Sequence, residues 1–190
     1  MNYLAIMVGA ILINNIVLVQ FLGICPFLGV SSKISTAVGM SSAVLFVMTL
    51  ATLATHLLYY SVLLPAGLAY LQTVSFILVI ASLVQLVEIV LKKVSPALYQ
   101  ALGVFLPLIT TNCAILGVAL LVVQRDYSLM QGLVFAIASA IGFGLALIIF
   151  AGIRERLSLA AVPKRLQGAP ISLITAGILA MAFMGFAGLM

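Results

Sequence analysis

The chain contains two cysteines, Cys25 and Cys113, and both stand in the same short pattern. The pattern is C-x-x-L-G-V, which reads CPFLGV from Cys25 to Val30 and CAILGV from Cys113 to Val118. A cysteine thiolate is a soft ligand that suits iron–sulfur clusters or zinc, and glycine lets backbone N–H groups approach the sulfur. A cluster normally takes four cysteines. Two cysteines would therefore form half of a metal site, and a partner would have to supply the rest.

Two other interpretations of the cysteines stay open at this point. Free cysteine packs well as a small buried hydrophobe. A disulfide would need an oxidant and two Cα atoms that lie close together. Packing alone leaves the shared pattern unexplained.

Helix-breaking and polar residues flank both copies of the pattern. They are Asn14, Asn15, Gln20, Gly23 and Pro26 around the first copy, and Pro107, Thr110, Thr111 and Asn112 before the second. Broken backbone is tolerated at membrane depth only where protein or a polar cavity satisfies its N–H and C=O groups. We expect the asparagines and threonines to serve mainly this structural purpose.

The composition is that of an integral membrane protein. Of the 190 residues, 66% are hydrophobic and 6% are charged, and the mean hydropathy is +1.42. Uncharged runs cover 1–32, 34–87, 94–124, 127–153 and 166–190. A transmembrane helix needs about 20 apolar residues, and the second run has room for two helices separated by a turn at Pro65 and Gly67. We therefore predict an all-α fold with six transmembrane helices, near 3–24, 36–58, 66–91, 98–122, 129–152 and 169–189.

The two copies of the pattern are separated by three predicted spans. Because three is odd, the second copy enters the membrane from the opposite face, as in an inverted repeat. The prediction is a single transmembrane domain, 1–190, built from repeats at approximately 1–93 and 94–190. The first and fourth helices would be broken near the bilayer centre, which would bring Cys25 and Cys113 towards one axis.

The cations predict the orientation. Seven follow spans one, three and five: Lys33, Lys92, Lys93, Arg154, Arg156, Lys164 and Arg165. Arg125 is the one cation on the other side. By the positive-inside rule the seven face the cytoplasm, and both termini face the periplasm of a bacterial inner membrane. Since the net charge of +5 is spread over the connections, it gives no indication of nucleic-acid binding.

Three stretches resemble a known family. They are NNIVLVQFLGICPFLGVS from Asn14 to Ser31, LPLITTNCAILGVALL from Leu106 to Leu121, and LITAGILAMAFMGFAGL from Leu173 to Leu189. These stretches resemble the family of the Rnf A-type and Nqr E-type membrane subunits. Those subunits belong to ion-translocating ferredoxin:NAD oxidoreductase and sodium-pumping NADH:quinone reductase complexes. The paired asparagines, CPFLGVS and TTNC resemble the Rnf members more closely.

The resemblance implies that Cys25 and Cys113 are ligands of an intramembrane [2Fe-2S] cluster. A homologous membrane subunit of opposite orientation, of the Rnf E type, would supply two further cysteines. Other partners would be the flavin- and iron–sulfur-bearing subunits of the complex. The chain would be an electron relay within a redox-driven translocase and not an enzyme alone. Candidates for shaping the site around the sulfurs are Gly23, Gly29, Asn112 and Gly117.

A different class also fits part of the pattern. Secondary transporters are built from inverted repeats with broken helices, and their substrate lies where we expect the cluster. A transporter has no need for thiolates at equivalent positions of the two repeats. A second family-level alternative is the equivalent membrane component of a sodium-pumping NADH:quinone reductase.

Three further features carry weaker expectations. Glu88 is expected to pair with Lys92 one helical turn away. The cationic segment 153–170 is expected to anchor at lipid headgroups or to dock a cytoplasmic protein of the complex. A seam of small residues, Gly132, Ala136, Ala140 and Gly144, predicts close helix packing on the fifth span.

Overall fold

The computed structural model describes residues 3–94, 106–160, 163 and 166–185, and all regular structure in these ranges is helical. In chain order the elements are α1 (Tyr3–Val8), the π-helical turn η1 (Gly9–Ile13), α2 (Ile24–Gly29), α3 (Ile34–Leu58), its π-helical extension η2 (Tyr59–Leu63), the 3₁₀ turn η3 (Ala69–Leu71), α4 (Gln72–Val94), α6 (Leu106–Thr110), α7 (Cys113–Gln124), α8 (Leu129–Leu159) and α9 (Ala169–Met184). The prediction of an all-α protein is confirmed for these ranges.

Four helices in the described residues are long and apolar enough to cross a membrane. They are Ile34–Leu63, Ala69–Val90, Pro107–Gln124 and Leu129–Leu159, and they coincide with the predicted spans near 36–58, 66–91, 98–122 and 129–152. The predicted spans near 3–24 and 169–189 fall on the shorter apolar helices Tyr3–Ile13 and Ala169–Met184. Residues 98–105 and 186–189 of these predicted spans lie outside the described residues. The first helix is short because the chain leaves helical geometry at Asn14 and returns to it at Ile24.

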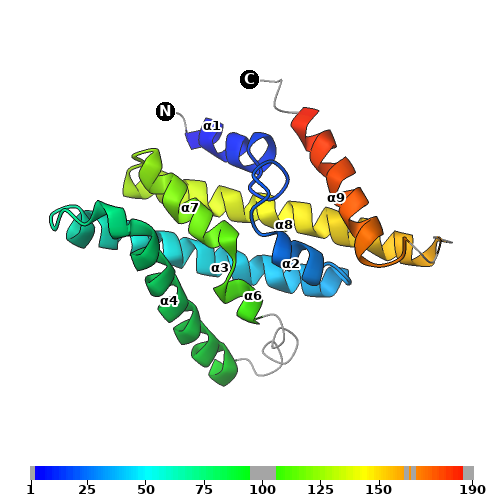
Figure 1. The fold of residues 1–190 in the computed structure, drawn as a ribbon, viewed down its shortest axis with the longest axis horizontal. Helices are drawn as coiled ribbons and strands as arrows, with labels where there is room; N and C mark the ends of the chain where they lie inside the picture. The colour runs from blue at the N-terminus through cyan, green and yellow to red at the C-terminus, as the bar shows by residue number, and fades with distance from the viewer. Residues whose placement is uncertain (1–2, 95–105, 161–162, 164–165, 186–190) are drawn as a thin grey trace.

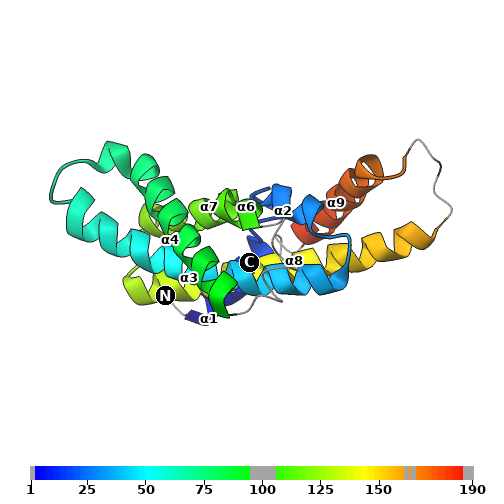
Figure 2. The same cartoon turned by 90° about the horizontal axis from the view of Figure 1, so that it is seen from below.

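Helices α3 and α8 run antiparallel and side by side along the long axis of the molecule (Figures 1 and 2). All four residues of the small-residue seam on α8 are buried, and one of them, Gly144, faces α3. A Cβ added to Gly144 would lie 3.1 Å from Cβ of Ser41 on α3, and one added to Gly132 would lie 2.8 Å from Cγ1 of Val122 on α7. The seam therefore packs against helices of this chain.

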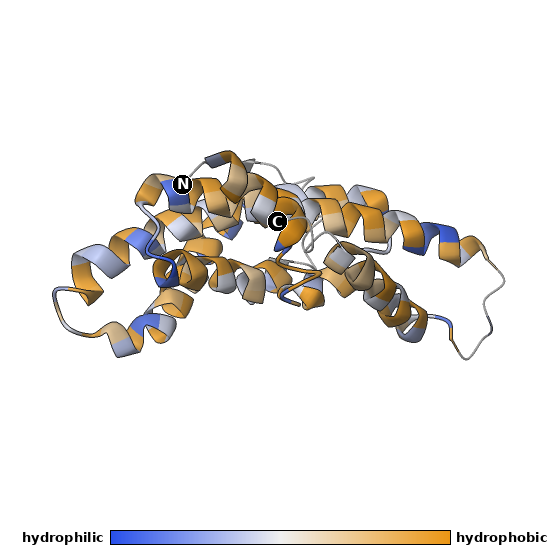
Figure 3. Cartoon of the chain, turned by 90° about the horizontal axis from the view of Figure 1, so that it is seen from above, coloured by the Kyte–Doolittle hydropathy of each residue, from blue (hydrophilic) through white to orange (hydrophobic). Residues whose placement is uncertain are grey.

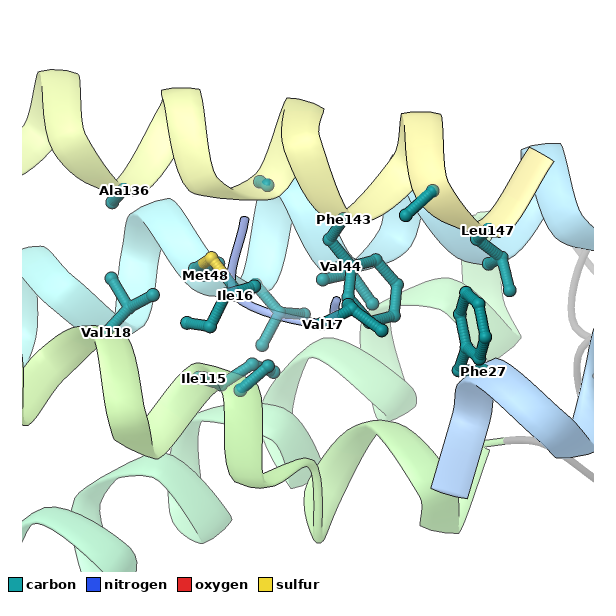
Figure 4. Close-up of a cluster of buried hydrophobic side chains, with 14 of the residues drawn as sticks. Ile16, Val17, Phe27, Val44, Met48, Ile115, Val118, Ala136, Phe143 and Leu147 are labelled. Atoms are coloured by element: carbon teal, nitrogen blue, oxygen red, sulfur yellow. The ribbon is translucent and has the colours of Figure 1, made fainter. Parts of the chain in front are cut away.

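The irregular segment between η1 and α2 is part of the hydrophobic core. Ile16, Val17 and Leu18 are each 2% exposed, although connecting segments usually run over the surface. Ile16 and Val17 meet side chains from four helices in one cluster (Figure 4). The other labelled members are Phe27 of α2, Val44 and Met48 of α3, Ile115 and Val118 of α7, and Ala136, Phe143 and Leu147 of α8.

The outer surface is apolar over most of its length. Figure 3 shows hydrophobic residues along the helices and a hydrophilic group near the C-terminal end of α8. Large hydrophobic side chains are exposed on α4 in particular, among them Val74, Ile77, Leu78 and Leu86. Exposed apolar patches of this extent are typical of a surface that contacts lipid or other proteins.

We predict that Gly132→Leu destabilises the protein in detergent, because overpacking of a closed core costs about 1–3 kcal/mol. Gly152→Leu is the matched control, since Gly152 is on the same helix and a Cβ there meets nothing within 4 Å. The measurement is the temperature at which the purified protein loses monodispersity. An equal loss in both variants would contradict the packing role of the seam.

Candidate metal centre

The break in the first apolar helix is stabilised by one fully buried amide side chain. Asn15 Oδ1 accepts the backbone N–H groups of Val17 and Leu18 at 3.1 and 3.4 Å. Its Nδ2 donates to the carbonyl oxygens of Ile11 and Gly142 at 3.1 and 2.8 Å. The nitrogen and the oxygen of the amide thus bond backbone groups before the break and within it. The bond to Gly142 also joins the break to α8. Asn15 has the structural role expected of it.

A second break separates α6 from α7. Asn112 is the N-cap of α7, and its Oδ1 accepts the N–H of Ala114 at 3.0 Å. Thr111 closes the end of α6, because its backbone N–H and its hydroxyl both donate to the carbonyl oxygen of Pro107, at 3.1 and 2.9 Å. Local side chains therefore cap both sides of the break, and α7 begins at Cys113.

The segments that contain the two breaks contact each other at the sulfur atom of Cys113. The backbone N–H of Gly23 donates to Sγ of Cys113 at 2.9 Å, across 90 residues of sequence. Gly23 has a φ of +80°, which L side chains rarely adopt. A Cβ at Gly23 would lie 2.9 Å from Cε2 of Phe143 and 3.2 Å from Cβ of Ala114. Glycine is required here for both its conformation and its lack of a side chain.

Cys25 lies two residues after this contact, in the first turn of α2, and Cys113 is the first residue of α7. The thiols of both cysteines are exposed and neither is in a disulfide. The hydrogen bond from Gly23 brings the two cysteine segments into one region of the surface.

The glycines of the C-x-x-L-G-V pattern contact the opposite segment. A Cβ on Gly117 would lie 2.6 Å from Cδ1 of Leu22, which precedes the first cysteine. A Cβ on Gly29 would lie 3.5 Å from Cδ1 of Leu108, which precedes the second. Gly117 thus makes room for a leucine of the other broken segment, whereas the distance at Gly29 is an ordinary van der Waals contact.

A cluster of contacts that no sequence pattern indicated holds α2 against α8. Arg154 Nη1 donates to the carbonyl oxygen of Leu28 and to Oγ of Ser31, both at 2.7 Å. Its guanidinium lies 5.9 Å from the ring centroid of Phe150, which in turn stacks on Phe27 at 4.3 Å. Only the folded chain brings these residues together, so composition and charge alone could not have found the cluster.

The described residues do not form a complete metal site on their own. No group of three or more His, Cys, Asp or Glu side chains in the described ranges is arranged to hold a metal ion. The two exposed thiols, with a backbone N–H already directed at one of them, fit two of the four ligand positions of an iron–sulfur cluster.

The fold and the site define an all-helical protein of membrane type, in which two broken helices bring a pair of exposed thiols to one surface. A family model described as "Rnf-Nqr subunit, membrane protein" matches residues 3–190. The chain belongs to this family, as the resemblance of its motifs predicted.

Curated relatives match over nearly the whole chain. The A-type subunit of the ion-translocating oxidoreductase complex of Syntrophotalea carbinolica is 62% identical over 188 residues, covering 99% of this chain and 97% of the relative. The A-type subunit of the Na⁺-translocating ferredoxin:NAD⁺ oxidoreductase complex of Acetobacterium woodii is 58% identical over 189 residues, covering 100% and 98%. The corresponding protein of Pseudoalteromonas translucida is 56% identical over 188 residues, covering 99% and 97%.

We predict that Gly23→Ala lowers stability by more than Gly67→Ala does. Both glycines have positive φ, +80° and +68°, so both substitutions carry the left-handed cost of about 1–2 kcal/mol. A Cβ at Gly67 meets nothing within 4 Å, whereas one at Gly23 collides with Phe143. Thermal unfolding in detergent measures the difference. Equal melting temperatures would mean that the close approach of Gly23 to Phe143 contributes little.

Proposed function

We propose that this chain is the A-type membrane component of an ion-translocating ferredoxin:NAD oxidoreductase complex, in which it relays electrons through the membrane. Its full-length similarity to relatives described in those terms supports the assignment. The chain thus contributes one membrane component to a redox-driven translocase.

The single observation that carries the relay proposal is the convergence of the two broken segments at Cys113, with Cys25 exposed close by in sequence. Cys25 and Cys113 are proposed as thiolate ligands of a [2Fe-2S] cluster, which supplies one-electron transfer when bound. Two cysteines from a homologous membrane subunit of opposite orientation complete the ligand set. The Gly23 N–H orients the Cys113 sulfur and stabilises its negative charge.

The proposed depth of the site explains why a relay is useful. A bilayer core of about 30 Å is a poor gap for a single electron transfer, and a centre near its middle divides it into two steps of about 15 Å. Residues next to the cysteines, such as Phe27, Ala114 and Ile115, hold the ligands in place, since they belong to a packed core.

The proposed topology is six spans in two inverted repeats, approximately 1–93 and 94–190. Two features support it: the shared C-x-x-L-G-V pattern, and a helix break directly before each copy, at 14–23 and 111–112. Both termini are proposed to be periplasmic, in the inner membrane of a bacterial cell. The bond from Arg154 to Ser31, two residues before Lys33, supports a common cytoplasmic side for these cations.

We predict that Cys25→Ser and Cys113→Ser each remove one iron–sulfur signal from the complex and stop electron transfer through it. Serine has nearly the volume of cysteine but is a hard and far weaker ligand, so assembly is expected to persist. Peripheral NADH oxidation with artificial acceptors should also continue. The measurements are EPR spectra of the reduced complex and turnover.

Thr111→Ser is the control for the cysteine variants, because Thr111 is exposed in the same break and serine retains the hydroxyl that bonds Pro107. This variant is expected to keep the signal and the turnover. Normal cluster content in both cysteine variants would mean that Cys25 and Cys113 are packing residues.

We predict that a reporter fused after Met190 is periplasmic, whereas one inserted after Pro163 is cytoplasmic. The physical reason is the excess of Lys and Arg in the connection that contains Pro163. The measurement uses two reporter enzymes at each position, one that is active only in the periplasm and one that is active only in the cytoplasm. The reverse pattern would overturn the orientation, and the same compartment for both would overturn the sixth span.

A further inference from the structure

Asn112 carries a buried hydrogen-bond donor that this chain does not use. The residue is 4% exposed, and its Nδ2 has no hydrogen-bond partner. Among the described residues, one other buried side-chain atom shares this state, Nε2 of Gln72. Leaving a buried polar group unpaired is costly, so such a group in a native fold calls for an acceptor outside the chain.

The orientation of the Asn112 amide is fixed by the fold. Its Oδ1 accepts the N–H of Ala114 at 3.0 Å as the N-cap of α7. Exchanging the two amide atoms would set an NH₂ group against that backbone N–H, so the oxygen and the nitrogen are assigned by their surroundings. Nδ2 is therefore held as a pure donor and is not free to rotate into the capping bond.

The amide also lies beside the sulfur site. Asn112 directly precedes Cys113, and its Oδ1 is 3.3 Å from the position that a Cβ on Gly23 would take. The N–H of Gly23 is the group that bonds Sγ of Cys113. Asn112, Gly23 and Cys113 thus lie together. The N–H of Gly23 donates to the sulfur of Cys113, and Nδ2 of Asn112 has no acceptor.

We propose that Asn112 Nδ2 donates a hydrogen bond to a sulfur of the metal centre and thereby raises its reduction potential. This inference rests on the proposed function, because it requires a cluster at Cys25 and Cys113. A donor directed at sulfur stabilises the more negative, reduced state, and hydrogen bonds to sulfur are among the factors that set cluster potentials. Asn112 then has two separate roles, with its oxygen capping α7 and its nitrogen tuning the centre.

Two substitutions separate these roles. Asn112→Ser keeps a good N-cap and removes the amide donor, whereas Asn112→Ala removes both. If Nδ2 of Asn112 bonds a sulfur of the metal centre, both variants have the same lowered midpoint potential. Only Asn112→Ala is expected to lose thermal stability, because it also removes the N-cap of α7. If Asn112 only caps the helix, Asn112→Ser retains the wild-type potential.

Gln72→Met is the matched control, because it deletes the other unpaired buried nitrogen. Gln72 is the first residue of α4, and this end of the helix lies away from α2 and α6 (Figures 1 and 2). The measurement is an EPR-monitored redox titration of the purified whole complex, following the signal that Cys25→Ser abolishes. We expect a shift to lower potential in Asn112→Ser and no shift in Gln72→Met.

Three outcomes decide the question. A lowered potential in both Asn112 variants supports the inference. An unchanged potential in Asn112→Ser, with the cysteine-dependent signal present, overturns the inference and leaves the proposed function standing. A wild-type complex with no signal that depends on Cys25 overturns both.

Discussion

The structure depends on hydrogen bonds to the backbone groups that the two helix breaks leave without helical partners in an apolar environment. A helix that stops inside a membrane leaves N–H and C=O groups that lipid cannot bond. In this chain Asn15 bonds four backbone groups around the first break, and Asn112 and Thr111 close the second. The bond from Gly23 to the Cys113 sulfur joins the two breaks. Without these bonds, two short helix starts could not bring their cysteines to one surface.

The surrounding helices hold this arrangement rigid. Helix α8 lies close to α3 at Gly144, and Asn15 is bonded to the backbone of α8 at Gly142. Arg154 and the stacked rings of Phe27 and Phe150 bind the short helix α2 to α8 as well. The segment that carries Cys25 is thus fixed by contacts with one long helix, and the bond from Gly23 joins it to Cys113. Rigid support of this kind is what an electron-transfer site needs to keep its geometry.

Much of the fold was predictable because its signals are local in sequence. Uncharged runs between cations predict the long helices, Pro65 and Gly67 mark the turn between α3 and α4, and Asn112 is an ordinary N-cap. The paired cysteines were found through a repeated pattern, and the family through longer motifs. The contacts of Gly23, Gly117 and Arg154 could not be derived, because each depends on which segments lie side by side. The extent of the first break, from Asn14 to Gly23, was also unpredictable, since its apolar residues have the composition of a continuous helix.

The proposed electron relay rests on metal binding by Cys25 and Cys113 in the assembled complex. Alkylation of the thiols followed by mass spectrometry tests it, because both side chains are exposed in the chain itself. If the two thiolates are cluster ligands, neither cysteine reacts in the intact complex and both react once iron has been chelated and removed. Prompt alkylation of both cysteines with full retention of iron would contradict a ligand role.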